Sequence, residues 1–166
     1  MQEALAKITS LAALPIEWHY IGPLQGNKTA EVASNFSWVH TIDRLRIAER
    51  LNNQRPDHLP PLNVLIQVNV SGEASKHGIA AEALPALAAE VAALPRLKLR
   101  GLMTLPAPNP DFGAQRAAFA VLRELAAASP VAMDTLSMGT SDDFEAAIAE
   151  GSTMVRLGTV IFGPRG

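Results

Sequence analysis

The stretch LNVLIQVNV at residues 62–70 is the clearest strand in the sequence and decides the fold class. Its apolar residues are almost continuous, whereas a strand with one wet face alternates apolar and polar positions. Such a run is typical of a parallel strand that helices cover on both faces. The flanking segments agree, because helical patterns lie on both sides, at about residues 43–53 and 79–94. We therefore expect an α/β protein with a parallel sheet.

The same alternation of helix and strand extends over the whole chain. Apolar spacing predicts helices at residues 2–13, 27–35, 43–53, 79–94, 111–128 and 142–150, and strands at residues 16–21, 36–42, 62–70, 97–105, 133–137 and 154–157. The fifth helix is expected to bury Phe112, Phe119 and Leu122. Six helix–strand pairs joined by right-handed crossovers indicate one parallel sheet. The residues alone leave two architectures open, a doubly wound sheet, which could use six strands, and a barrel, which needs about eight.

Length and composition limit the class of protein. The 166 residues suit one domain, so residues 1–166 are expected to form a single unit. The formal net charge of −2 offers no basic surface for nucleic acid or anionic lipid. The absence of cysteine excludes disulfides and thiol catalysis, and the four histidines lack metal-ligand spacing. Because the first residues do not form an apolar signal segment, we expect a cytoplasmic protein without nucleic-acid or membrane partners.

Two glycine-containing turns follow the last two predicted strands. One holds Ser137, Gly139 and Ser141, and the other holds Gly158 and Thr159. Ligands of parallel α/β folds bind at the carboxyl ends of the strands, where backbone N–H groups and helix starts favour anions. The turns therefore indicate a site for a phosphate-type anion. The alternative is a pair of ordinary strand–helix turns whose Gly and Ser residues only satisfy helix caps.

Arg156 lies inside the last predicted strand, where a buried charge needs a partner. That partner is either a ligand or, in a purely structural interpretation, the carboxylate of Asp134 or Asp142. Elsewhere, Asp43 and the pair Asp142-Asp143 are interpreted as helix N-caps.

Three other features attract attention but favour structural interpretations. His19, between Trp18 and Tyr20 in a strand, is interpreted as a half-buried residue with satisfied hydrogen bonds. The segment GPLQGNKT (22–29) departs from a phosphate-binding P-loop, because three residues separate its glycines and Asn27 precedes Lys28. The segment SGEASKHG (71–78), with Lys76 and His77, has the composition of an exposed loop.

Several blocks taken together resemble one family. They are WHYIGPLQGNKT (18–29), HTIDRL (40–45), NVLIQVNVSGEASKHG (63–78), LRGLMTLPAP (99–108) and LSMGTSDDFEAAIAEGSTMVRLGTVIFGPR (136–165). They closely resemble the pyridoxal phosphate homeostasis protein family, which is similar to the N-terminal domain of alanine racemase. The resemblance implies a (β/α)8 barrel of the TIM type that carries pyridoxal 5′-phosphate on a Schiff-base lysine. It further implies buffering and delivery of the cofactor inside the cell, without turnover.

The resemblance also implies roles for particular residues. Ser137, Gly139 and Ser141 would contact the phosphate from one turn, and Gly158 and Thr159 would contact it from the other. Arg156 would face the pyridine nitrogen and keep it unprotonated, which weakens the ring as an electron sink and suits a carrier. Three residues at the ends of neighbouring strands would line the pocket: His19, Asn69 and Met103.

This sequence departs most from the family pattern at its start. Members of the family begin with roughly 60 more residues, which hold two strands and the Schiff-base lysine. We therefore expect about six of the eight β/α units, without that lysine, because Lys7, Lys28, Lys76 and Lys98 do not match its position. The complete fold is expected to be monomeric, whereas open sheet edges would allow the shorter chain to self-associate. The expected partners are pyridoxal phosphate and pyridoxal-phosphate-dependent apoenzymes. The alternative function is a small isomerase or racemase with a phosphate-bearing ligand.

Overall fold

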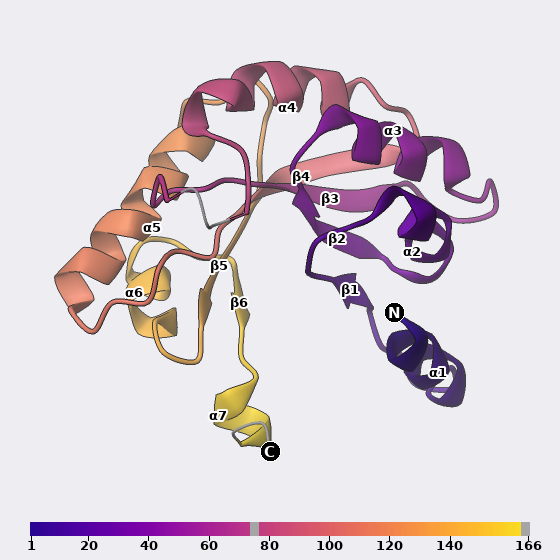
Figure 1. The fold of residues 1–166 in the computed structure, drawn as a ribbon, viewed down its shortest axis with the longest axis horizontal. Helices are drawn as coiled ribbons and strands as arrows, with labels where there is room; N and C mark the ends of the chain where they lie inside the picture. Colours follow the sequence, from indigo (N-terminus) through magenta and orange to yellow (C-terminus); the bar gives the residue numbers. More distant parts are fainter. Residues whose placement is uncertain (74–76, 164–166) are drawn as a thin grey trace.

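The computed structural model describes residues 1–73 and 77–163, in which helices and strands alternate as predicted (Figure 1). The elements are α1 (Gln2–Ser10), β1 (His19–Tyr20), the 3-10 turn η1 (Gly26–Lys28), α2 (Thr29–Asn35), β2 (Trp38–Ile42), α3 (Leu45–Gln54), β3 (Leu62–Gln67), the 3-10 turn η2 (Ala81–Ala83), α4 (Leu84–Ala92), β4 (Leu97–Met103), α5 (Phe112–Ala127), β5 (Thr135–Thr140), α6 (Phe144–Ala149), β6 (Met154–Arg156) and α7 (Thr159–Phe162).

The six strands form one sheet in the order β1-β2-β3-β4-β5-β6, and every neighbouring pair is parallel. A doubly wound sheet reverses its strand order at a switch point, whereas a barrel adds its strands in sequence. Figure 1 shows that the sheet is curled, with α2 to α6 along its outer side and with α1 and α7 near the two ends of the arc. The prediction of an incomplete TIM-type barrel with six β/α units is confirmed.

Strand β3 shows why residues 62–70 are almost continuously apolar. Its side chains alternate between two layers, and both layers are dry. Leu62, Val64 and Ile66 are fully buried in the cluster that joins the sheet to its outer helices. Leu65 points the other way, into a smaller cluster with Trp38 and Met103. The continuous run therefore follows from burial on two faces.

Several local expectations are corrected. Strand β1 is limited to His19–Tyr20, although the sequence indicated a strand from residue 16. Phe119 and Leu122 are fully buried, but Phe112 at the start of α5 is 49% exposed. Its first-turn position places it beyond the part of the helix that packs on the sheet.

One predicted cap, Asp43, is wrong, and Asp143 stands at the predicted N-cap position of its helix but makes no capping hydrogen bond. Helix α3 begins after Arg44, and the Asp43 carboxylate pairs with the Arg44 guanidinium at 2.8 Å instead of capping the helix. Helix α6 begins after Asp143, which makes no side-chain cap and instead accepts hydrogen bonds from the backbone N–H and hydroxyl of Thr140. In both cases a donor outside the helix, on Arg44 or on Thr140, satisfies the carboxylate. No helix in the described ranges has the length and apolarity needed to cross a bilayer.

Candidate functional site

The candidate site is built around Arg156, the last residue of β6. Its Nη1 donates to the Ser137 hydroxyl at 2.7 Å, and its Nη2 donates to the Thr104 carbonyl oxygen at 2.9 Å. None of the ion pairs among the described residues includes it. Burial lowers the pKa of Arg156 to about 10, against the opposing effect of Asp143. Arg156 is therefore a largely desolvated cation held by neutral acceptors, with N–H groups to spare.

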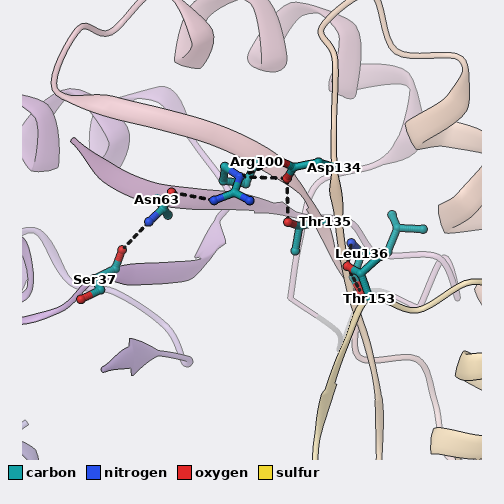
Figure 2. Close-up of polar contacts among 7 residues, drawn as sticks. All are labelled: Ser37, Asn63, Arg100, Asp134, Thr135, Leu136 and Thr153. Atoms are coloured by element: carbon teal, nitrogen blue, oxygen red, sulfur yellow. Dashed lines mark hydrogen bonds and ion pairs between the residues drawn. The ribbon is translucent and has the colours of Figure 1, made fainter. Parts of the chain in front are cut away.

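The structural ion pair predicted for Arg156, with Asp134 or Asp142, does not form among the described residues. Figure 2 shows the Asp134 carboxylate beside Arg100 of β4, whose Nε donates to it at 2.8 Å. The same guanidinium donates to Asn63 at 3.1 Å and lies over the Trp38 ring, 4.9 Å from its centroid. Asp142, the other candidate, forms no ion pair among the described residues.

His40 of β2 is a site residue that the sequence argument missed. Its Nδ1 lies 2.9 Å from the Ser137 hydroxyl, and its Nε2 lies 2.9 Å from Nδ1 of His19. Burial, with smaller contributions from His19 and Arg156, lowers the pKa of His40 to about 3, so this imidazole is neutral. One sign was present in the sequence, a histidine within the mostly apolar strand WVHTI. Its partner Ser137 lies 97 residues away, beyond the reach of any local pattern.

His19 is half-buried, as predicted. Its ring stacks on Trp38 at a centroid distance of 5.3 Å, and its Nε2 lies 3.6 Å from the Glu17 carboxylate. Burial lowers the pKa of His19, although Glu17 opposes the shift. Through its contact with His40, the His19 ring extends the connected polar side chains to β1 at the edge of the sheet.

The end of β5 meets the β6–α7 turn, but the first predicted phosphate turn is corrected: Ser137 and Gly139 lie inside β5 (Thr135–Thr140), and only Ser141 follows the strand. The Ser141 hydroxyl, after β5, accepts a hydrogen bond of 3.3 Å from the backbone N–H of Val160 in α7. Gly158 is the residue before α7, and Thr159 is its first residue, as predicted for a short helical turn. Gly139 has a φ of +97°, and a Cβ there would lie 2.6 Å from the Cβ of Ala147. This glycine therefore allows α6 to pack closely against β5.

One predicted contact, that of Ser137, differs from what the structure offers. Ser137 is fully buried, and its hydroxyl is occupied by His40 and Arg156, so it presents no surface to a phosphate. The backbone N–H of Thr140 is taken by Asp143, which places a negative charge at the start of α6. Because Ser137 and the Thr140 N–H are already engaged, we expect the hydrogen-bond donors for an anion to come mainly from the turn between β6 and α7.

Two residues that were predicted to line the pocket, Asn69 and Met103, make other contacts. The Asn69 side chain turns into its own loop, where its Nδ2 donates to the Glu73 carbonyl at 2.8 Å and its Oδ1 accepts from the Gly72 N–H at 3.1 Å. Met103 is fully buried in the inner cluster with Trp38 and Leu65. The predicted exposure of Lys76 lies outside the described residues.

Arg156 lies between two cavities. The first, of about 820 Å³, covers the carboxyl ends of β3 to β6, and its lining includes Gln67, Gly139, Thr140 and Arg156. The second, of about 580 Å³, lies between β1 and β6, and its lining includes Glu17, His19, His40, Arg156 and Gly158. The surplus N–H groups of Arg156 are thus next to space that a small ligand can enter.

Comparisons with known proteins agree with this architecture. The family model described as alanine racemase, N-terminal domain, matches residues 1–166. The pyridoxal phosphate homeostasis protein of Pseudomonas aeruginosa is 61% identical over 165 residues, which are 99% of this chain and 72% of that protein. The protein of the same name from Escherichia coli is 57% identical over 174 residues, covering 99% of this chain and 73% of that protein.

Solved structures show the same fold. PipY of Synechococcus elongatus is similar with a TM-score of 0.88 and 34% identity, covering 98% of this chain and 78% of that chain. Its structure with PLP bound has a TM-score of 0.86 at 32% identity, with the same coverage. Alanine racemase of Clostridium difficile shares the fold alone, with a TM-score of 0.68 and 16% identity over 97% of this chain and 44% of that chain. The chain belongs to the pyridoxal phosphate homeostasis protein family, whose fold is that of the N-terminal domain of alanine racemase.

Proposed function

We propose that this chain binds pyridoxal 5′-phosphate at the Arg156 site and serves in intracellular homeostasis of that cofactor. The observation that carries the proposal is the largely desolvated guanidinium of Arg156, which has no carboxylate partner among the described residues and borders two cavities. The names of its relatives and the presence of PLP in one PipY structure support it.

The residues present fit this cofactor. Arg156 offers N–H donors to an acceptor such as the pyridine nitrogen, and Ser141, Gly158 and Thr159 lie where the end of β5 meets the β6–α7 turn and would hold the phosphate. Pyridoxal phosphate supplies an aldehyde and an electron-withdrawing ring when it is bound. A guanidinium leaves the ring nitrogen unprotonated, which weakens that electron withdrawal. This favours storage and delivery to apoenzymes in the cytoplasm over turnover, with residues 1–166 acting as one binding unit.

The described lysines favour noncovalent binding by this chain. Lys98 is exposed near the amino end of β4, the opposite end from the site. Lys7 pairs with Glu3 on α1, and Lys28 pairs with Glu31. The ammonium groups of these three lysines therefore lie away from the Arg156 site.

The test is equilibrium dialysis of the purified chain against pyridoxal 5′-phosphate, with inorganic phosphate as competitor. We expect saturable binding that phosphate weakens and that Arg156→Gln reduces by about tenfold or more. Arg46→Gln is the matched control, because Arg46 is exposed on α3 and its loss changes the net charge equally. Absence of saturable binding, or equal binding by Arg156→Gln, would refute the proposal. Racemase or isomerase turnover that is lost in Ser137→Ala would instead favour the enzymatic alternative.

A further inference from the structure

A continuous chain of polar side chains crosses the inside of the curled sheet. It runs from His19 of β1 to His40 of β2, then to Ser137 of β5 and Arg156 of β6, through contacts of 2.9, 2.9 and 2.7 Å. His40 is 1% exposed and Ser137 is fully buried, so water does not substitute for these contacts. Because β2 and β5 are not neighbours in the sheet, only its curl allows this connection.

The row of side chains from His19 to Arg156 has one arrangement of protons in which every one of these contacts is a hydrogen bond with a donor and an acceptor. A guanidinium only donates, so the Ser137 oxygen accepts from Arg156. The Ser137 O–H then donates to Nδ1 of His40, the remaining partner that the structure gives it. His40 therefore carries its proton on Nε2 and donates to Nδ1 of His19. His19 in turn carries its proton on Nε2, which faces the Glu17 carboxylate.

A second positive charge would disrupt this order. Protonated His40 donates from Nδ1, so the Ser137 oxygen would face two cationic donors, and its hydroxyl proton would lose its acceptor. The charged groups around the chain are Glu17 beside His19, Arg156 on β6 and Asp143 after β5. Neither carboxylate contacts His40, so nothing among the described residues compensates a charge on that ring.

We infer that His40, supported by His19, is a positioning residue: its neutral imidazole orients the Ser137 hydroxyl and thereby aims the Arg156 guanidinium at the ligand. This inference rests on the proposed function for the identity of the ligand, but the proton arrangement is a property of the ligand-free chain. His40 acts through Ser137 and Arg156 and does not itself bind the phosphate.

The first test needs no ligand. Two-bond ¹H–¹⁵N correlation spectra of the ¹⁵N-labelled chain report the tautomer and the charge of each imidazole. We expect His40 to be the Nε2–H tautomer at pH 7 and to keep its neutral signals at pH 5. An Nδ1–H tautomer, or a protonated His40 at pH 5, would overturn the inference. This result stands whether or not the chain binds pyridoxal 5′-phosphate, so it separates failure of the inference from failure of the proposed function.

The second test compares variants in equilibrium dialysis with pyridoxal 5′-phosphate. His40→Phe keeps a planar ring without hydrogen bonds, whereas His40→Asn keeps an acceptor near the position of Nδ1. We expect about a tenfold loss of affinity for His40→Phe and less than about a threefold loss for His40→Asn. His58→Phe is the control, because His58 is exposed in the loop before β3. With native circular dichroism, unchanged affinity in His40→Phe, or equal losses in both His40 variants, would contradict the positioning role.

Discussion

The guanidinium of Arg156 is hydrogen-bonded at 2.7 Å to the hydroxyl of Ser137, although both residues were expected to face a ligand. This bond joins β6 to β5 and makes the serine a support for the arginine. The site therefore has two tiers: Arg156 borders the cavities, and Ser137 with His40 holds it from within the sheet.

Replacing Ser137 by alanine should destabilise the chain and weaken its ligand binding together. The change removes the acceptor of Arg156 and leaves Nδ1 of His40 without a donor in a dry interior. We expect a loss of about 1–3 kcal/mol in the free energy of unfolding, measured by urea denaturation. Ser34→Ala, at an exposed position in α2, should change it by less than about 0.5 kcal/mol. Equal stability of the two variants would contradict the supporting role of Ser137.

The stability of the chain should fall between pH 7 and pH 5. The pKa of His40 is about 3 in the folded chain and 6.5 without the fold, so the unfolded chain binds more protons in this range. The contribution of His40 is complete above pH 6.5 and decreases as the pH falls toward 3, which amounts to about 2 kcal/mol by pH 5. His19 acts in the same direction because its pKa is also lowered.

Urea titrations at several pH values measure this slope. The carboxylates with lowered pKa values, among them Asp134, lose their contributions at lower pH and leave this range to the histidines. His40→Phe should show a clearly shallower slope. If wild type and variant lose stability in parallel from pH 7 to pH 5, the histidine is not the cause.

Gly139→Ala should separate α6 from β5. The added Cβ would lie 2.6 Å from the Cβ of Ala147, and the φ of +97° is unfavourable for alanine. We expect a cost of about 1–3 kcal/mol in thermal or urea unfolding. Gly158→Ala is the matched stability control, because its φ is −115° and no atom lies within 4 Å of the added Cβ. A Gly139→Ala chain as stable as this control would argue against close packing at β5.

Arg100→Lys should destabilise the inner layer of the sheet without affecting the ligand site directly. A lysine lacks the planar fork that contacts Asn63 and Asp134 (Figure 2). The same guanidinium lies over the Trp38 ring. We expect a loss of about 1 kcal/mol in unfolding followed by tryptophan fluorescence. Arg46→Lys, exposed on α3, should leave the transition unchanged. Identical midpoints for the two variants would show that the charge alone suffices at position 100.

Much of the fold was predictable because it depends on local patterns. The apolar run at residues 62–70 indicated a strand buried on two faces, and the structure shows this directly, because the successive residues Val64 and Leu65 enter different clusters. The turn after β6 was placed correctly, but the segment expected to form the turn after the fifth strand lies mostly inside β5, which runs to Thr140 and leaves only Ser141 beyond it. Neither aspartate makes a capping hydrogen bond, because the Asp43 carboxylate pairs with Arg44 and the Asp143 carboxylate, although at the N-cap position of α6, accepts from Thr140.

The sequence by itself determined the order of helices and strands and the position of the turn after β6, because hydrophobic periodicity and turn residues act over a few neighbouring positions. Only the tertiary structure decided which side chains meet. His40 reaches Ser137 across 97 residues because the sheet curls, and the curl is the summed result of strand twist and helix packing along six strands. The same curl places Arg156 between neutral hydrogen-bond acceptors and two cavities. The Asp134 carboxylate, which the sequence suggested as its ion-pair partner, is bound to Arg100.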